Sequence, residues 1–401
     1  MTGSVFAAVP LAPRDPILGL NEQFGADPRG DKVNLGVGVY YDDAGKLPLL
    51  ESVHAAEAQR VQATPPRGYL PIDGIAPYNQ AVQTLLLGAD SPLIAQKRAV
   101  TVQALGGTGA LKVGADLIER FVPGASVWIS DPSWENHRAL FESAGFAVRN
   151  YPYYQAATNG LDFDGMMATL SGLPAGDVVV LHACCHNPTG IDLSDAQWDR
   201  VVAVCRERGL LPFLDIAYQG FGDGIDADAA AVRKFAAAGI DFLVSSSFSK
   251  SFSLYGERVG ALTVVCADGD EASRVLSQVK RVVRTNYSNP PTHGATLVST
   301  VLSTPALRAR WEDELAGMRE RIRAMRAQLV EKLAQRGVQR DFSFIVRQRG
   351  MFSYTGLTAA QVDRLRDEFG IYAVSTGRIC MAALNSRNID RVADAIAAVS
   401  K

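Results

Sequence analysis

The 401-residue chain has few cysteines, few histidines and almost no net charge. Its five cysteines are an odd number in a long chain, and Cys184 and Cys185 are too close to bridge without strain. This excludes a disulfide framework and favours a reducing compartment. Cys184-Cys185-His186 has no second ligand pair at a workable spacing, so we predict no metal site. A net charge of -2, with no block of like charges, argues against nucleic acid as a partner.

The sequence also lacks a long apolar run. No stretch approaches the ~20 apolar residues of a membrane span, and residues 1–16 have no basic segment followed by an apolar core. We therefore expect a cytoplasmic protein without a membrane partner. Charged residues make up 20% of the chain and apolar residues 47%, which is typical of a soluble globular enzyme or binding protein.

What the sequence does contain is an alternation of short apolar runs and amphipathic stretches. The apolar runs favour strands that are covered on both faces. They span residues 99–104, 126–130, 178–182, 211–215, 242–246 and 261–266. Helices are predicted between them at 109–121, 136–144 and 194–208. This alternation indicates an α/β fold with a mainly parallel sheet.

A second, smaller unit is predicted after about residue 304, because the chain exceeds the usual size of one core. It is expected to begin with a long helix over 305–336. Strands are then predicted at 344–346, 351–354 and 379–381, and helices at 359–369 and 388–399. The segment up to residue 45 could pack on this unit or reach another subunit. We divide the chain into a large domain of residues 46–304 and a small domain of residues 1–45 and 305–401.

A lone lysine, Lys250, lies among serines just after the apolar run 240–244. Burial would lower the pKa of this amine, so that its neutral form could attack a carbonyl. Arg258, eight residues later, could bring a guanidinium to the same cavity and bind a phosphate. Together the two residues suggest pyridoxal phosphate. Taken alone, a lysine among serines is more often a solvated loop residue.

Asp215 ends an apolar run, at the position where ligands gather in open α/β sheets. Opposite a pyridine nitrogen, its carboxylate would keep that nitrogen protonated, although an aspartate that caps a helix is the other interpretation. Tyr218 and Asn187 could hydrogen-bond the phenolate oxygen of the same ring. His137 and His182 could contact Asp215 and fix the position of its carboxylate.

Further candidates follow other predicted strands. Gly106-Gly107-Thr108-Gly109 lies between a strand and a helix, where backbone N–H groups could close on a phosphate. Trp134 could stack on a planar ring, although it could equally be a core residue. Arg378 could bind an α-carboxylate with two parallel hydrogen bonds, and Arg284 a second carboxylate. For either arginine alone, a surface ion pair is the alternative.

Four motifs that occur in order resemble those of the class I pyridoxal-phosphate aminotransferases. They are Asn187-Pro188-Thr189-Gly190, Asp215-Ile216-Ala217-Tyr218, Ser247-Phe248-Ser249-Lys250 and Gly256-Glu257-Arg258. The similarity runs nearly end to end and is greatest for the bacterial aspartate and aromatic branch. It implies fold type I, in which a large domain has a mainly parallel seven-stranded sheet between helices and a smaller α/β domain is added. It also implies a homodimer with active sites at the subunit interface.

The resemblance implies roles for the candidate residues. Lys250 would form the Schiff base with pyridoxal 5'-phosphate and then move a proton, while Asp215 pairs with the pyridine nitrogen and Tyr218 holds O3′. The other implied cofactor ligands are Gly107, Thr108, Trp134, Asn187, Ser247, Arg258 and, from the second subunit, Tyr69. The implied substrate-binding residues are Gly38, Trp134, Asn187 and Arg378, with Arg284 and Ser288 from the second subunit.

The implied reaction is a ping-pong transamination of Phe, Tyr, Asp and Glu, with 2-oxoglutarate as the amino acceptor. Tyr41 and Leu47 favour aromatic substrates because they lower the cost of desolvation, whereas Thr108 and Asn289 are similar to the aspartate enzymes. A strict aspartate aminotransferase is the main alternative. A decarboxylase or eliminating enzyme with the same cofactor is another. A non-enzymatic regulator that binds pyridoxal phosphate is the last, but the chain lacks the DNA-binding domain and basic charge for that role.

Overall fold

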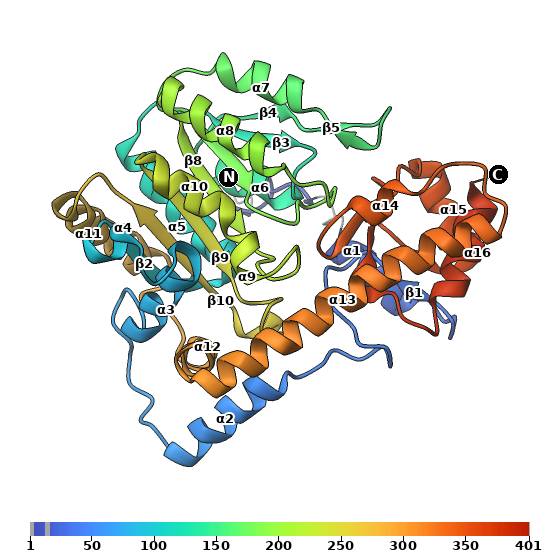
Figure 1. Cartoon of the computed structure of the whole chain (residues 1–401), viewed down its shortest axis with the longest axis horizontal. Helices are drawn as coiled ribbons and strands as arrows, with labels where there is room; N and C mark the ends of the chain where they lie inside the picture. The colour runs from blue at the N-terminus through green and yellow to red at the C-terminus, as the bar shows by residue number, and fades with distance from the viewer. Residues whose placement is uncertain (1–3, 13–16, 401) are drawn as a thin grey trace.

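The computed structural model describes residues 4–12 and 17–400, and its main feature is a seven-stranded sheet (Figure 1). In spatial order the strands are β2 (Ala99–Leu105), β10 (Val259–Val265), β9 (Phe242–Ser247), β8 (Leu211–Ile216), β7 (Val178–His182), β3 (Val127–Asp131) and β4 (Val148–Pro152). Only β10 runs antiparallel to its neighbours in this sheet. The prediction of a mainly parallel seven-stranded sheet is confirmed.

Helices cover both faces of this sheet, because its strands bury apolar side chains on both sides. In β7, Val178 and Val180 belong to one apolar cluster, while Val179 and Leu181 belong to the other. The first cluster includes residues of α5 (Gly106–Phe121) and α11 (Gly269–Asn286). The second includes residues of α3 (Ala76–Leu87), α7 (Phe163–Ser171), α8 (Asp195–Arg208) and α10 (Ala230–Ala238).

The bounds of α8 show how local sequence places these helices. The Ser194 hydroxyl accepts a hydrogen bond from the backbone N–H of Gln197, and the Gln197 side chain accepts one from the N–H of Ser194. This reciprocal pair satisfies two N–H groups at the start of the helix. Gly209 ends the helix with φ +64°, a conformation that glycine adopts without strain. The sequence predicts both ends correctly.

A 31-residue helix, α13 (Pro305–Gln335), connects the large sheet to a second group of elements (Figure 1). One end contacts α2 (Glu51–Ala63) and α12 (His293–Ser303), and the other contacts α14 (Phe344–Arg347) and α16 (Ile389–Val399). Two small sheets lie in this group. They pair β1 (Val33–Asn34) with β12 (Ile371–Tyr372), and β11 (Phe352–Tyr354) with β13 (Arg378–Cys380). The part of the N-terminal segment that contains β1 therefore packs on the C-terminal group, while the division into two domains stays a prediction.

The remaining elements are short. They are α1 (Leu18–Ala26), α4 (Pro92–Ala95), α6 (Glu135–Ser143), α9 (Ile225–Asp228), α15 (Ala359–Phe369), β5 (Tyr154–Gln155), β6 (Gly160–Leu161) and the 3-10 helices η1 (Tyr255–Glu257) and η2 (Met381–Ala383). Within the described residues, no helix combines the length and apolarity needed to cross a membrane.

One predicted strand is wrong. Residues 344–346 form part of the short helix α14, because the Asp341 carboxylate accepts a hydrogen bond from the N–H of Ser343 at 2.7 Å and starts a turn. Phe344 and Ile345 are both buried there, instead of alternating between two faces as in a half-buried strand.

The strand β4 did not appear among the predicted apolar runs, because Arg149 is exposed at the edge of the sheet.

Candidate active site

A cavity of about 370 Å³ lies at the carboxyl ends of β7, β8 and β9, where loops from both groups of elements meet. This is the edge at which open α/β sheets bind ligands. The lining residues come from all the sequence motifs and from the N-terminal segment. They are Ile17, Val37, Gly38, Val39, Gly107, Thr108, Leu111, Trp134, His182, Asn187, Asp215, Ala217, Tyr218, Ser247, Ser249, Lys250, Tyr255, Arg258, Phe352 and Arg378.

Lys250 enters this cavity from the loop between β9 and β10. Its ammonium nitrogen lies 4.9 Å from the centroid of the Tyr218 ring. Burial lowers the pKa of Lys250 to about 8, and the positive charge of Arg258 acts in the same direction, while the carboxylate of Asp215 opposes both. Near neutral pH, the side chain therefore exists partly as the neutral amine that can act as a nucleophile or base.

Asp215 lies near the end of β8 and is 5% exposed. Burial alone would raise the pKa of Asp215, but the hydrogen bond from His137 and the positive charge of Lys250 outweigh it and lower this pKa. The Nε2 of His137 donates to the carboxylate at 3.0 Å, and its Nδ1 lies 2.9 Å from the Ser133 hydroxyl. Asp215 is thus held as a carboxylate at one end of the cavity.

Of the two histidines expected to support Asp215, His137 hydrogen-bonds its carboxylate, whereas His182 lies with its ring centroid 5.0 Å from that of His137. Both ring nitrogens of His182 are buried, and neither has a hydrogen-bond partner among the described residues. Burial, with a contribution from His137, lowers the pKa of His182 to about 3. His182 is therefore a neutral residue in the wall of the cavity near Asp215.

The opposite end of the cavity has the features of a phosphate site. Gly106 and Gly107 begin α5, whose first turn contains no acidic residue. Backbone N–H groups at such a helix start have no partner within the helix and attract an anion. A Cβ on Gly106, where φ is +68°, would lie 2.5 Å from Nη2 of Arg258. Ser247, at the end of β9, also lines this end, so a guanidinium, a hydroxyl and N–H groups converge there.

Arg378 provides a second guanidinium, and it is buried at 1% exposure. Its Nη1 donates to the Oδ1 of Asn187 at 3.1 Å, and its Nη2 donates to the carbonyl of Gly36 at 2.7 Å. The Nε–H is buried without a partner among the described residues. Its guanidinium carbon lies 4.3 Å from the centroid of the Phe352 ring. A buried guanidinium with an unused donor is suited to a carboxylate ligand.

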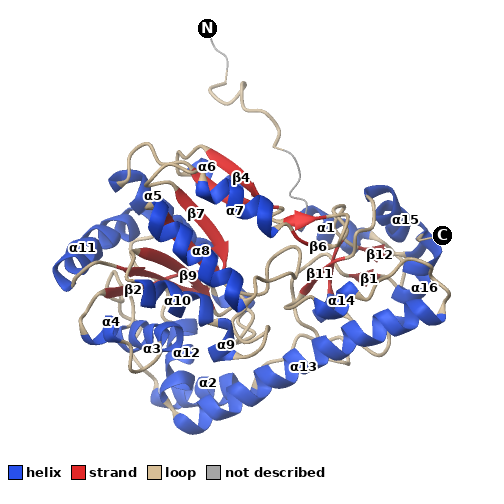
Figure 2. Cartoon of the chain, turned by 45° about the horizontal axis from the view of Figure 1, so that its top comes forward, coloured by secondary structure: helices blue, strands red, loops and turns tan. Residues whose placement is uncertain are grey.

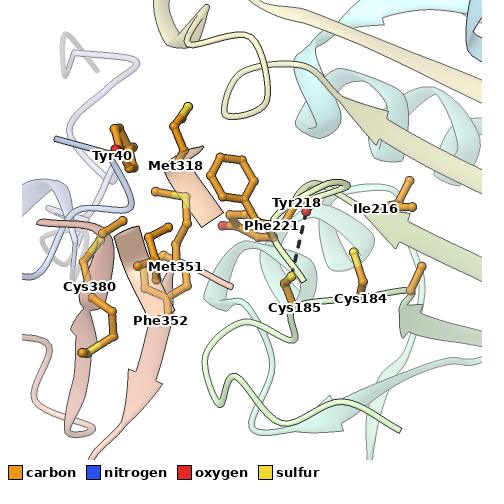
Figure 3. Packing of buried hydrophobic residues seen from close by; sticks show 14 of the residues in the cluster. Tyr40, Cys184, Cys185, Ile216, Tyr218, Phe221, Met318, Met351, Phe352 and Cys380 are labelled. Carbon is orange, nitrogen blue, oxygen red and sulfur yellow. Dashed lines mark hydrogen bonds between the residues drawn. The ribbon is translucent and has the colours of Figure 1, made fainter. Parts of the chain in front are cut away.

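The aromatic side of the cavity is formed by Trp134, Tyr218 and Phe352. Trp134 immediately precedes α6, and its ring lies 5.3 Å from that of His137 in an edge-to-face arrangement. The rings of Tyr218 and Phe352 are in edge-to-face contact, with centroids 6.0 Å apart, and Figure 3 shows Tyr218 near Cys185 and Phe352 near Met351. Together with Trp134 they line the cavity, so a planar ligand would have aromatic surface beside it.

The structure brings most of the predicted site residues together. The residues that line the one cavity are Gly38, Gly107, Thr108, Trp134, Asn187, Asp215, Tyr218, Ser247, Lys250, Arg258 and Arg378. Tyr69, Arg284 and Ser288 do not line it. Tyr69 is 97% exposed, and Arg284 is exposed on α11, where it contacts the hydroxyl of Ser288. Their predicted contribution to a second subunit stays a prediction.

Several lining residues were not predicted. Tyr255 faces the cavity, and its hydroxyl accepts a hydrogen bond from the N–H of Tyr40 at 3.0 Å. Its place between Lys250 and Arg258 was the only sequence signal. Val37, Val39 and Phe352 form an apolar part of the wall, and their residue types gave no sign of it. The groups in the cavity fit a planar ligand that carries an aldehyde, a ring nitrogen and a phosphate.

Comparisons with known proteins agree with this geometry. Residues 30–396 match the family model for class I and II aminotransferases. The chain is 65% identical over 396 residues to an aspartate aminotransferase of Pseudomonas aeruginosa, which covers 99% of this chain and 100% of that protein. It is 54% identical over 397 residues to the aromatic-amino-acid aminotransferase of Escherichia coli, with 98% and 100% covered.

A solved structure is similar along the whole chain. The crystal structure of an aromatic-amino-acid aminotransferase from Burkholderia pseudomallei, covalently bound to pyridoxal phosphate, superposes with a TM-score of 0.98. The two sequences are 69% identical, and the match covers 100% of each chain.

Proposed function

This chain belongs to the class I and II aminotransferases, and we propose that it transfers amino groups from both aromatic and dicarboxylic amino acids to 2-oxoglutarate. It is a pyridoxal-phosphate-dependent enzyme of fold type I. The observation that supports the substrate proposal is the pairing of buried Arg378 with an apolar wall in one cavity. The guanidinium suits the α-carboxylate of any amino acid, while Val37, Val39 and Phe352 suit an aromatic side chain.

The residues of the cavity fit pyridoxal phosphate at three points. Gly107 and Thr108 at the start of α5, with Ser247 and Arg258, would hold its phosphate, because all four line the same cavity. The N–H of Gly106 donates to the carbonyl of Arg258 at 3.0 Å and so fixes that residue beside the helix start. Asp215, kept ionised by His137, would accept a hydrogen bond from the protonated ring nitrogen. Lys250 would reach the aldehyde carbon. When bound, the cofactor supplies an electron sink for the carbanion at the substrate Cα.

The side chains of the cavity would then bind the substrate and transfer its protons. Arg378 and Asn187 orient the amino acid by its carboxylate. The lowered pKa of Lys250 leaves its amine partly neutral, so that it can take the proton from the substrate Cα and return it later. Tyr218 and Asn187 would hydrogen-bond the ring oxygen and favour its anionic form. The same groups act in reverse order when 2-oxoglutarate receives the amino group in the second half-reaction.

The proposed assembly is a homodimer in which Tyr69, Arg284 and Ser288 of each subunit complete the cavity of the other. The exposure of two predicted site residues and of the N-terminal residues supports this homodimer. Tyr69 is 97% exposed, and Arg284 is an exposed cation whose side chain contacts the Ser288 hydroxyl. Residues 4–12 stand away from the rest of the chain (Figure 2), and Val5 and Leu11 are 91% and 99% exposed. The five cysteines are unpaired thiols, which supports a reducing compartment such as the cytoplasm.

The test is the visible spectrum of the holoenzyme after separate additions of phenylalanine, tyrosine, aspartate and glutamate, without a keto acid. Each true amino donor should convert the cofactor to its amino form and release its own keto acid in stoichiometric amount. Conversion by both aromatic and dicarboxylic donors is the expected result. An enzyme that released carbon dioxide or ammonia instead of keto acid would contradict the proposal.

A strict aspartate aminotransferase is the second candidate, because the relative with 65% identity is named an aspartate aminotransferase. The same experiment separates the two. Conversion by aspartate and glutamate alone, with phenylalanine and tyrosine inactive at saturating concentration, would establish the narrower specificity and exclude the dual one.

A further inference from the structure

Arg326 is a buried arginine in the middle of α13. It is 2% exposed, and the described residues place no carboxylate within ion-pair distance of its guanidinium. Burial lowers the pKa of Arg326 to about 10, so the group remains a cation near neutral pH. Burial of an unpaired charge is costly unless hydrogen bonds replace the lost water. The stability of this buried cation therefore depends on the hydrogen bonds that its guanidinium makes.

All of these hydrogen bonds end in one short segment, residues 345–353. Nη2 donates to the carbonyls of Gly350 at 2.8 Å and Phe352 at 2.6 Å. Nη1 donates to the carbonyl of Ile345 at 3.3 Å and also contacts the Ser353 hydroxyl. One guanidinium thus links α13 to α14, to the turn that follows it and to the start of β11. An apolar side chain at position 326 would remove the guanidinium donor from the carbonyls of Gly350 and Phe352, whereas the Ile345 carbonyl would keep its hydrogen bond from the N–H of Gln348.

The other side of this segment forms the wall of the cavity. The Phe352 ring lies against the guanidinium of Arg378. A Cβ on Gly38 would come within 2.6 Å of the Cζ of Phe352, so the ring also lies close to the backbone at Gly38. The segment also contacts the loop that carries Asn187, because the N–H of Arg349 donates to the carbonyl of Gly190 at 2.6 Å. Residues 349–352 therefore lie between Arg326 and the two residues, Arg378 and Asn187, that face the substrate carboxylate.

We propose that Arg326 is a positioning residue for the carboxylate site: it fixes the backbone of Gly350 and Phe352, and thereby holds the Phe352 ring and the Arg378 guanidinium in the orientation that receives the substrate. This inference rests on the proposed role of Arg378. It assigns Arg326 an effect on carboxylate affinity, although its side chain does not reach the cavity.

The test compares the holoenzyme with its Arg326→Met and Arg323→Met variants. Arg323 is on the same helix, one turn earlier, and is exposed, with hydrogen bonds to the carbonyl of Gly222 and to Asp223. The probe is 3-phenylpropionate, a carboxylate with no amino group to react, and its Kd is measured by calorimetry. Bound cofactor is measured in parallel from the visible absorbance.

The Arg326→Met variant should bind 3-phenylpropionate roughly tenfold to hundredfold more weakly, because small displacements of binding groups have effects of that size. Its cofactor content should match that of the wild type, since the phosphate site and Asp215 lie at other parts of the cavity. The Arg323→Met variant should keep the wild-type Kd. A lower melting temperature of Arg326→Met with an unchanged Kd would overturn the inference, because that result describes a role in stability alone.

Two further variants decide the remaining outcomes. If Arg326→Met does not fold, Arg326→Lys replaces it: lysine keeps the charge with fewer donors, so an intermediate rise in Kd is expected and an unchanged Kd overturns the inference. Arg378→Met should raise the Kd at least as much as Arg326→Met. An unchanged Kd in Arg378→Met would overturn the proposed carboxylate site itself, and the inference with it. A loss of affinity in Arg378→Met alone would overturn only the inference.

Discussion

At the scale of single residues, Lys250 offers the most direct test of the chemistry. Its side chain faces the cavity, so Lys250→Ala removes the nucleophile and base without disturbing the core. The steady-state rate with aspartate and 2-oxoglutarate should fall by roughly 10²- to 10⁴-fold, as expected when a proton-transferring group is lost. The control is Lys280→Ala, which removes a surface lysine near Asp73. A Lys250→Ala enzyme that kept a substantial rate would contradict the assignment.

The protonation of Lys250 gives a second prediction. In the cofactor-free protein, the pKa of Lys250 is about 8, compared with the ordinary value of 10.5. The neutral, reactive fraction grows as the pH rises through the pKa, so the rate of acylation of Lys250, followed by mass spectrometry, should have its midpoint near pH 8. The carboxylate of Asp215 raises this pKa, so Asp215→Asn should move the midpoint lower. A midpoint near pH 10 would show that the amine is not desolvated.

Some site residues could be predicted from the sequence and others could not, for a physical reason. Asp215 lies near the carboxyl end of one buried strand and Lys250 follows another. Parallel strands bring their carboxyl ends to one edge, so an alternating pattern is sufficient to place the two residues together. Arg326 lies in the middle of a long helix rich in arginine, where nothing marks it as buried. Its role depends on which face of α13 meets β11, and that contact is set by tertiary packing between segments distant in sequence.

At the scale of elements, the start of α2 depends on a residue from another helix. Leu50, which precedes α2, provides no side-chain cap. Instead Glu314, on α13, accepts hydrogen bonds from the N–H of Glu51 at 2.6 Å and from the N–H of Ser52 at 3.2 Å. Glu314→Ala should lower the melting temperature by about 1–4 °C, the usual effect of a lost cap in a large protein.

The control for this prediction is Glu312→Ala on the same helix. Glu312 forms an exposed pair with Arg308 at 2.9 Å, and such pairs contribute little to stability. Both variants should be measured at one protein concentration, since an oligomer unfolds in a concentration-dependent way. Equal melting temperatures for the two variants would show that α2 does not need Glu314.

Strands were predicted correctly where every side chain is buried, and they were missed or misassigned where exposed residues or a short apolar run weaken the pattern. The strand β7 is buried at every position, so its apolar run is continuous and visible in the sequence. The edge strand β4 exposes Arg149 and Asn150, which removes that signal. The apolar residues 344–346 are too few for periodicity to separate a strand from a helical turn, and Asp341 favours the turn.

At the scale of the whole molecule, a hybrid experiment tests the shared active sites. Lys250→Ala should inactivate the subunit that carries it, whereas Arg284→Ala should impair aspartate binding in the other subunit of a homodimer. After unfolding and refolding of an equal mixture, half of the dimers should be hybrids with one intact site. The mixture should then regain about a quarter of the wild-type rate with aspartate, as expected for random pairing in a two-fold dimer.

The two variants refolded separately are the control, and each should stay nearly inactive with aspartate. If the mixture is no more active than the mean of the separate samples, Arg284 acts on its own subunit or has no role in the site. Subunits that sediment as monomers at the concentration of the assay would contradict the shared site directly.

The reversed strand β10 has a consequence for the evolution and engineering of this cavity. Because β9 and β10 pair antiparallel, with Ser247 opposite Gly260, the residues between them form a closed loop of fixed length. The amine of Lys250 and the guanidinium of Arg258 are both carried by that loop, so the length of the backbone sets how far apart they can lie. Exchange of side chains leaves the length of this loop unchanged. A vitamer without the phosphate would be held at one end only, and accepting a longer one would require an insertion between residues 248 and 258.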